Sequence, residues 1–382
     1  MKTVKFGADK IITGSDSLSH LSTLGKEIHR ALIIMGQGSL KRNGFLKKLQ
    51  DVLAEGGIES DIFMGVEADP TFSTIMKGAE KAKAYQPDAI IGFGGGSAMD
   101  AAKVIWIYYE NPELNTLESI LLPNVIPKLG EKAKLICIPT TAGTGSEVTR
   151  VAVITDDEKH VKHAVVDLKL RMVPWLALLC PEFTVSMPPN VTAVSGMDAM
   201  THAIESYVCV SANSFSEALS LQAFKEAYQY LPLACQDGEN LEYRNRMLTA
   251  SCIAGIAFSN CSLGIAHSIA HTLGGRYGIP HGTACALALP YVIGFNERDS
   301  AVSAKYHEMA AAVGYHMLQD AIIAMCEKLG LPTRLRGYFE SREAFEKDLP
   351  DLAALAAADA STPSNPVPAD ADVLLELIGQ MY

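Results

Sequence analysis

Two pairs of side chains that bind transition metals are each separated by one helical turn. One pair is Asp198 and His202, the other is His267 and His271, and His281 follows in a Pro-His-Gly turn. Residues four apart lie on one face of a helix, so each pair can project into the same cavity. One carboxylate with three imidazoles would suit Fe(II) or Zn(II) and leave a coordination position for a substrate.

The surroundings of these histidines favour a metal site over ordinary core packing. A single histidine on an apolar helix is more often a buried core residue, and Asp198 alone would fit an exposed helix. Residues 261–282, however, are rich in small and apolar side chains and hold three histidines without an acidic residue. Because buried polar groups need partners, imidazoles that gather in such a segment indicate a shared ligand.

Two loops rich in glycine and hydroxyl side chains indicate a nucleotide site. Residues 94–97, Gly-Gly-Gly-Ser, lie between a predicted strand and helix, where glycine lets the backbone approach a phosphate. The pattern is not the G-x-G-x-x-G fingerprint, and a tight turn without a ligand is the alternative. A second loop rich in Thr, Gly and Ser covers residues 140–149. In a parallel α/β domain, both loops would lie at the carboxyl ends of strands, where ligands bind.

Length, charge and cysteine content restrict the class of protein. The 382 residues suffice for two domains, and 48% hydrophobic with 20% charged residues is typical of a globular protein. A net charge of −11 argues against a nucleic acid or an anionic membrane as partner. Eight cysteines without a C-x-x-C pair, and an N-terminus without the apolar core of a signal peptide, predict a cytoplasmic protein with reduced thiols. No apolar run is as long as a membrane span.

The hydrophobic pattern predicts two domains of different class. Short β-rich runs alternate with helical patterns up to residue 186, which predicts a parallel Rossmann-like sheet with helices on both faces. From residue 187 to 382 we find only helical patterns, and Pro188-Pro189 marks the boundary. The predicted strands are residues 30–35, 60–65, 88–93, 134–139, 151–155, 162–166 and 177–180.

These motifs together resemble the iron-dependent (group III) alcohol dehydrogenases over nearly the whole chain. The shared blocks are EADPT, GGGSAMDAAK, IPTTAGTGSEVT, the Asp-x3-His of Asp198 and His202, and GIAHSIAHTLGG followed by PHG. VEADPT and GGGSAMDAAK look close to the alcohol-dehydrogenase half of bifunctional aldehyde/alcohol dehydrogenases. The resemblance implies a dehydroquinate synthase-like architecture. Residues 1–186 would be the dinucleotide-binding α/β domain, and residues 187–382 an all-helical metal-binding and substrate domain.

The resemblance also implies roles for particular residues. His271 would be an additional active-site histidine that helps to relay a proton, and Phe258 would line the substrate pocket. The implied metal ligands are Asp198, His202, His267 and His281. The implied cofactor contacts are Gly94, Gly95, Gly96, Ser97 and Asp100 around the pyrophosphate, Thr140, Thr141, Thr144 and Ser146 in the second loop, and Lys162 near the ribose.

Two departures from the family pattern bear on the cofactor. Relatives that prefer NAD carry Asp at the position of Gly36, where the carboxylate grips ribose hydroxyls and would repel a 2′-phosphate. With glycine there, and with Ser39, Lys41 and Arg42 nearby, the sequence favours NADP(H) over NAD(H). Asp69 stands where relatives have an Asn that contacts the cofactor, so this contact would differ here.

The implied reaction is reversible hydride transfer between C4 of a nicotinamide and the carbonyl carbon of a small aldehyde, which yields a primary alcohol. The metal would polarise the carbonyl as a Lewis acid. A zinc-dependent polyol dehydrogenase of the glycerol type is the alternative. A lyase of the dehydroquinate synthase type and a non-enzymatic nucleotide-binding protein are further alternatives. Relatives are often homodimers or larger homo-oligomers, and the β-rich residues 3–6 could serve as an intersubunit strand.

Overall fold

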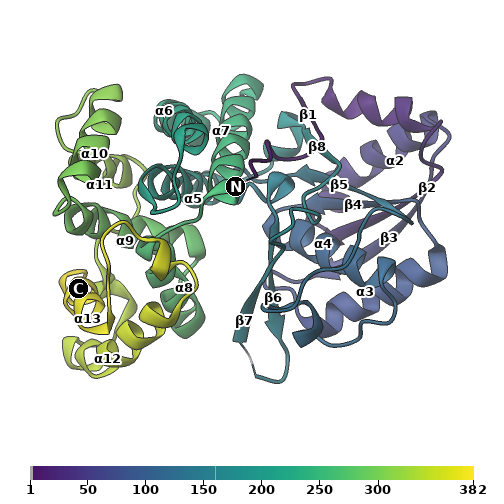
Figure 1. Cartoon of the computed structure of the whole chain (residues 1–382). Helices are drawn as coiled ribbons and strands as arrows, with labels where there is room; N and C mark the ends of the chain where they lie inside the picture. The colour runs from purple at the N-terminus through teal and green to yellow at the C-terminus, as the bar shows by residue number, and fades with distance from the viewer. Residues whose placement is uncertain (1–2, 160) are drawn as a thin grey trace. The chain divides into compact units, whose positions relative to one another are not determined.

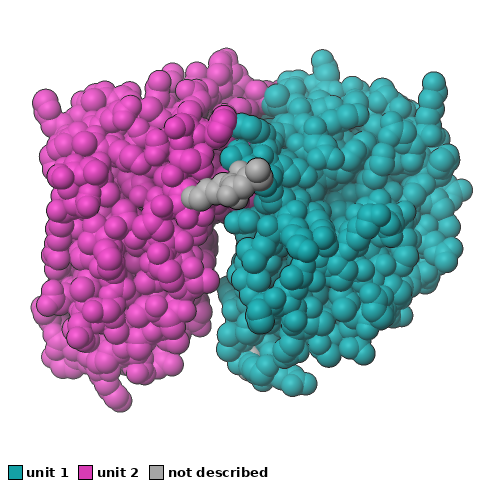
Figure 2. Space-filling view, in the orientation of Figure 1, with its two compact units in different colours: residues 1–186 teal, residues 187–382 magenta. Residues whose placement is uncertain are grey.

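The computed structural model describes residues 3–159 and 161–382, which divide into two compact units. Unit 1 covers residues 1–186 and unit 2 covers residues 187–382 (Figure 2). In unit 1 the chain alternates between strands and helices, whereas the elements of unit 2 are helices (Figure 1). The expected α/β fold followed by a helical region is therefore confirmed.

A six-stranded parallel sheet forms the centre of unit 1. Its strand order is β1-β8-β5-β4-β2-β3, and every neighbouring pair is parallel. All six residues of β4 are buried, as expected for a strand covered on both faces. The strands are β1 (Lys10–Thr13), β2 (Arg30–Gly36), β3 (Glu59–Val66), β4 (Ala89–Gly94), β5 (Lys134–Pro139) and β8 (Leu176–Leu179).

Helices cover both faces of this sheet and form two separate core clusters. Along β2, Leu32 and Ile34 face one side and pack in a cluster with α3 (Phe72–Tyr85) and α4 (Gly96–Glu110). The alternate residues Ile33 and Met35 pack with α2 (Phe45–Glu55) and the 3₁₀ helix η1 (Ser17–Leu24). The shorter helices of unit 1 are α1 (Ser39–Arg42), η2 (Glu118–Ile120), η3 (Ser146–Val148) and η4 (Pro181–Thr184).

The seven predicted strands all occur, but two of them lie outside the parallel sheet. β6 (Val151–Asp156) and β7 (Val161–Val166) pair with each other as an antiparallel hairpin. Only residues 157–160 separate them, whereas a parallel crossover needs a dozen residues or more, so including them in the parallel sheet was wrong. The edge strand β1 was not predicted, because three of its four residues are exposed and its apolar pattern is weak.

Unit 2 consists of helices, and no strand occurs in residues 187–382, all of which are described. The first, α5, begins at Pro189, because proline is tolerated in the first helical turn. Helix α5 ends at Val208. The other α-helices are α6 (Ser214–Gln236), α7 (Leu241–Asn260), α8 (Ile265–Tyr277), α9 (His281–Asn296), α10 (Ser300–Ala312), α11 (Leu318–Lys328), α12 (Arg342–Ala358) and α13 (Ala371–Gln380). Two short 3₁₀ helices are η5 (Leu335–Tyr338) and η6 (Thr362–Ser364).

Glycine and proline set the corner between α8 and α9. Gly278 ends α8 with φ of +65°, a left-handed conformation that residues with a Cβ adopt rarely. Pro280 then precedes His281, the first residue of α9. The corner brings His281, at the start of α9, next to His271 in the middle of α8, and their ring centroids lie 5.3 Å apart.

In the part of the chain that the structure describes, no single helix is long and apolar enough to cross a membrane. Among the described residues, only α7 and α8 together have the length and apolar composition of a membrane span, and they meet at a bend of 106°.

Candidate metal centre and cofactor loops

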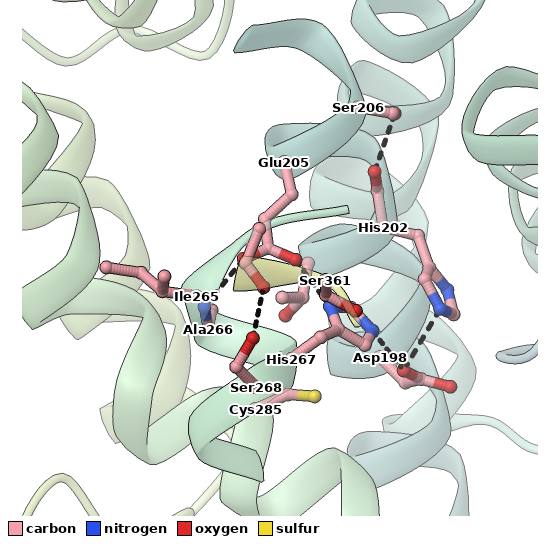
Figure 3. Close-up of polar contacts among 12 residues, drawn as sticks. Asp198, His202, Glu205, Ser206, Ile265, Ala266, His267, Ser268, Cys285 and Ser361 are labelled. Carbon is pink, nitrogen blue, oxygen red and sulfur yellow. Dashed lines mark hydrogen bonds and ion pairs between the residues drawn. The ribbon is translucent and has the colours of Figure 1, made fainter. Parts of the chain in front are cut away.

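Three helices of unit 2 bring one aspartate and three histidines together. Asp198 and His202 come from α5, His267 from α8 and His281 from the start of α9. Asp198 Oδ1 lies 3.6 Å from His202 Nε2, 3.6 Å from His267 Nε2 and 3.4 Å from His281 Nε2. Figure 3 shows Asp198 between the rings of His202 and His267. One carboxylate oxygen thus faces three imidazole nitrogens.

These separations suit a shared metal ion better than hydrogen bonds. They exceed the usual N–H···O range of about 2.7–3.2 Å. Two ligands that each lie about 2.1 Å from one tetrahedral ion would be roughly 3.4 Å apart. Asp198 Oδ1 and His267 Nε2 are also fully buried without a hydrogen-bond partner. Such atoms are costly to leave unsatisfied, so the residues present fit a divalent transition metal.

The protonation states also favour metal binding by Asp198 and His202. Burial opposes ionisation of Asp198, but the surrounding histidines lower the pKa of its carboxyl well below the usual value. Burial lowers the pKa of His202 to about 4. At neutral pH the aspartate is therefore ionised and His202 is neutral, which are the forms that coordinate metals. Although burial opposes it, Glu205 and Asp198 raise the pKa of His267 to about 10, so His267 would release a proton on binding a metal.

Cys285 joins the cluster, while His202 lies beside it. The donor atoms of Asp198, His267, His281 and Cys285 all lie within 4.8 Å of one another. Cys285 follows His281 by one turn of α9, with its Sγ 3.7 Å from His281 Nε2. The ring of His202 stacks on that of His267, with centroids 4.6 Å apart. We did not predict Cys285 as part of the site, although its spacing from His281 was the available signal.

A buried glutamate orients His267. Glu205 is 3% exposed, and its Oε2 lies 2.5 Å from His267 Nδ1 (Figure 3). Its Oε1 accepts a 2.7 Å hydrogen bond from the backbone N–H of Ala266. These contacts fix the imidazole so that Nε2 points at Asp198, the usual arrangement behind a histidine that binds a metal. Sequence reasoning missed Glu205, although it lies seven residues after Asp198 on the same helical face.

The replacement Glu205→Gln is expected to lower metal affinity by roughly 10- to 100-fold, because the partner of His267 Nδ1 loses its charge. Titration of the metal against a competing chelator would measure the affinity. Glu308→Gln is the matched control, since that carboxylate accepts a hydrogen bond from Tyr207 instead. Equal affinity in Glu205→Gln and wild type would contradict an orienting role.

His271 lies next to the cluster but has a different partner. Its Nδ1 lies 2.8 Å from Asp359 Oδ2, and its ring stacks on that of His281 with centroids 5.3 Å apart. Asp359 Oδ1 accepts hydrogen bonds from the Ser361 N–H at 2.8 Å and the Ser268 hydroxyl at 3.3 Å. Although burial opposes it, the bond with His271 lowers the pKa of Asp359 to about 2. Asp359 is thus a charged acceptor that holds the His271 ring, and the sequence did not indicate it.

The predicted substrate residue Phe258 lies against the metal cluster. It belongs to α7, and its ring stacks on His202 with centroids 4.4 Å apart and planes 23° apart. Phe258 therefore covers one face of the His202 imidazole, which places an apolar surface beside the cluster.

The two glycine-rich loops of unit 1 lie against each other. β4 ends at Gly94 and β5 at Pro139, which are paired in the sheet, so both loops leave the same edge. The N–H of Thr140 donates to the Gly94 carbonyl at 2.9 Å. A Cβ added at Gly96 would lie only 2.8 Å from Thr144 Cγ2. Glycine at this position therefore avoids a close contact with the Thr144 side chain. The contact of this loop with a phosphate remains a prediction.

Several predicted cofactor residues are engaged within the protein. The Ser146 hydroxyl donates to Asp100 Oδ1 at 2.6 Å, and the Ser97 hydroxyl donates to the Ala68 carbonyl. Asp69 forms a 2.7 Å ion pair with Lys162 on the exposed surface. Of the remaining residues, Gly36 ends β2 and Ser39 begins α1, and those along the loops are Gly95, Thr140, Thr141 and Thr144.

Both units match one enzyme family. Residues 8–181 match the iron-containing alcohol dehydrogenases, and residues 192–382 match the C-terminal region of the Fe-containing alcohol dehydrogenase family. An NADPH-dependent butanol dehydrogenase from Clostridium saccharobutylicum is 40% identical over 380 residues, which cover 97% of this chain and 96% of that protein. The bifunctional aldehyde-alcohol dehydrogenase of Escherichia coli (strain K12) is 41% identical over 322 residues, which cover 79% of this chain and 36% of that longer protein.

Solved structures agree with this match. An iron-containing alcohol dehydrogenase from Thermococcus thioreducens superposes with a TM-score of 0.91 at 34% identity, covering 100% of this chain and 99% of that chain. The fold and the Asp–His cluster together are those of metal-dependent dehydrogenases. The chain belongs to the iron-containing alcohol dehydrogenase family, and it is an NAD(P)-dependent alcohol dehydrogenase that interconverts a small aldehyde and its alcohol. The resemblance noted in the sequence is confirmed.

Proposed function

We propose that this enzyme reduces short-chain aldehydes to primary alcohols with NADPH as the hydride donor. The observation that carries the proposal is the buried Asp198 oxygen that faces His267 and His281 without a hydrogen-bond partner. Asp198, His202, His267 and His281 would hold Fe(II) or Zn(II). When bound, such an ion supplies Lewis-acid polarisation of the substrate carbonyl. In the balanced reaction, the carbonyl carbon gains the hydride from C4 of NADPH and the carbonyl oxygen gains a proton.

His271 is proposed to deliver that proton. Its Nδ1 is held by the ionised Asp359, which leaves Nε2 as the nitrogen that exchanges a proton with the substrate oxygen, directly or through water. Its ring is 43% exposed, so solvent can reprotonate it. Phe258 shields the neighbouring ligand His202 and is proposed to contact the alkyl part of the substrate.

The cofactor is proposed to bind along the two loops of unit 1. Backbone N–H groups at the start of α4 and the hydroxyls of Thr140, Thr141 and Thr144 would hold the pyrophosphate and nicotinamide portions. A preference for NADP(H) is supported by Gly36, Lys41 and Arg42, and by the NADPH dependence of the related butanol dehydrogenase. Lys162 is proposed to exchange its pairing with Asp69 for a contact to the ribose.

The replacement Gly36→Asp is expected to shift the ratio of kcat/KM for NADPH over NADH by on the order of tenfold or more towards NADH, which corresponds to ~1.4 kcal/mol. The new carboxylate would repel a 2′-phosphate and accept hydrogen bonds from free ribose hydroxyls. The nearest atom to an added Cβ is the Val66 carbonyl oxygen at 3.5 Å, so the fold should accommodate it. Gly337→Asp is the control, because an added Cβ there meets nothing within 4 Å. An unchanged ratio would refute the cofactor assignment.

The function itself is tested by the oxidation of NADPH and NADH with short aldehydes, using Fe(II)- or Zn(II)-loaded protein without oxygen. Metal-dependent turnover that prefers NADPH and short aldehydes is the expected result. Activity confined to glycerol with zinc would identify the polyol dehydrogenase instead, and substrate conversion without net cofactor oxidation would identify a lyase.

We also propose a reducing, cytoplasmic compartment and a homodimer or larger homo-oligomer. All eight cysteines are free and seven of them are buried, which supports the first proposal. Residues 3–6 form no strand within a single chain, so pairing with a partner remains a prediction. Light scattering coupled to size-exclusion chromatography would measure the assembly.

A further inference from the structure

A fully buried lysine lies beneath the two cofactor loops of unit 1. Lys103 belongs to α4 and is 0% exposed. Its ammonium donates to the Ser146 hydroxyl at 2.8 Å, the Thr149 hydroxyl at 3.0 Å and the Val151 carbonyl at 2.8 Å. An ammonium has three N–H groups, so this buried cation is fully hydrogen-bonded.

All partners of Lys103 belong to one stretch of chain, residues 146–151, which continues the second cofactor loop. Asp100, one turn earlier on α4, holds the same stretch. Its Oδ1 accepts from the Ser146 hydroxyl at 2.6 Å, and its Oδ2 accepts from the Val153 N–H at 2.9 Å. Four hydrogen bonds therefore fasten residues 146–151 to the helix that begins in the pyrophosphate loop, and a fifth fastens Val153.

At the surface, the same two loops are in contact. Gly96, the first residue of α4, lies so close to Thr144 that an added Cβ would be 2.8 Å from its Cγ2. Thr144 is in turn tied to Ser146, whose N–H donates to its Oγ1 at 3.2 Å. A displacement of Ser146 would move Thr144 relative to Gly96. The spacing of the two loops therefore depends on the hydrogen bond that the Ser146 hydroxyl accepts from Lys103 and on the one that it donates to Asp100.

We propose that Lys103 is a positioning residue for the cofactor: it holds the second loop against the pyrophosphate loop and so sets the affinity for NADP(H) without contacting the cofactor. This inference rests on the proposed function, which places the cofactor at these loops. Its mechanism is preorganisation, because loops that are already fixed lose less conformational freedom on binding.

The neighbouring Glu147 argues against a role in stability alone. Glu147 is 1% exposed, and its Oε1 has no hydrogen-bond partner. A buried polar cluster with an unsatisfied member generally stabilises a fold less than apolar packing of the same volume would. The cluster is thus better explained by the geometry that it imposes on the loops.

The test compares full-length, metal-loaded wild type with Lys103→Met, which keeps the length of the side chain and removes the ammonium. The dissociation constant for NADPH, measured by fluorescence titration, is expected to rise about tenfold or more, because a small misplacement of binding groups has large effects. At saturating NADPH, kcat should change less than about twofold, because Lys103 does not contact the reacting atoms and the bound cofactor keeps its position relative to them. Thr149→Val removes one acceptor and should give a smaller rise in the dissociation constant.

Arg244→Met is the matched control. Arg244 is another buried cation, 1% exposed, and it donates to Thr192 and to the Gly238 and Met187 carbonyls in unit 2. It should lower the melting temperature and leave NADPH affinity unchanged. A folded Lys103→Met variant with wild-type NADPH affinity would overturn the inference. If Lys103→Met does not fold, wild-type NADPH affinity in Thr149→Val would overturn it instead. A wild-type enzyme that binds no NADPH would instead refute the proposed function.

Discussion

His267→Ala is expected to release the metal and to reduce kcat/KM by about 10³-fold or more, because transition-state stabilisation worth several kcal/mol disappears. His267 is 1% exposed, and it supplies the buried nitrogen that faces Asp198. Removing it also leaves the Oε2 atom of the buried Glu205 without its partner, while Oε1 still accepts from the Ala266 N–H. Metal content after dialysis, measured by elemental analysis alongside activity, checks the prediction.

His281→Ala distinguishes loss of metal from loss of fold. Its ring is 41% exposed, so this replacement disturbs packing less while it removes another proposed ligand. Cys285→Ser is the counterpart that should keep the metal. Burial and the carboxylates of Asp198 and Glu205 raise the pKa of the Cys285 thiol well above its usual value in the metal-free chain, and Cys285 is not among the four proposed ligands. Full metal occupancy in both histidine variants would contradict the proposed site.

His271→Ala is expected to lower kcat by roughly 10²- to 10⁴-fold while the bound metal stays, since general acid–base catalysis contributes about that much. The side chain is 43% exposed, so the helix should tolerate alanine. Single-turnover rates at saturating NADPH and aldehyde would report the chemical step, and elemental analysis would confirm metal content.

Asp359→Asn provides the comparison for this variant. Asparagine keeps the size of the side chain but removes the charge that holds His271 Nδ1 at 2.8 Å. A fall in kcat smaller than that of His271→Ala is expected, because the ring remains but is held less firmly. If His271→Ala retained the wild-type kcat, the proton would have to come from another group or from water.

The elements of the fold could be predicted from the sequence because their patterns are local. Apolar runs such as residues 88–93 and 134–139 differ from strands β4 and β5 by at most one residue at either end. Which strands pair is not local, and the hairpin of β6 and β7 was therefore misplaced. Its short connection was the one sequence feature that excluded a crossover.

The residues of the site also fall into two groups, those that a local spacing in the sequence indicates and those that only the folded structure shows. Pairs on one helix, such as Asp198 with His202, are visible as a spacing of four residues. Glu205, Asp359 and Lys103 act through contacts between segments far apart in the chain, and charged residues of this kind are common in any sequence. Asp100 and Ser146 were predicted as cofactor contacts; the structure shows that the Ser146 hydroxyl donates to Asp100, and the contacts with the cofactor stay predictions.

The proposed ligands lie on α5, α8 and α9, and the long helices α6 and α7 separate α5 from the other two in the chain. An ion held by all three would act as a cross-link that closes a large loop of polypeptide, comparable to a disulfide between distant cysteines. Closing such a loop restricts the unfolded chain, and metal affinity then becomes folding free energy. The supply of metal in the cell would thus affect the stability of unit 2 against unfolding as well as the activity of the enzyme.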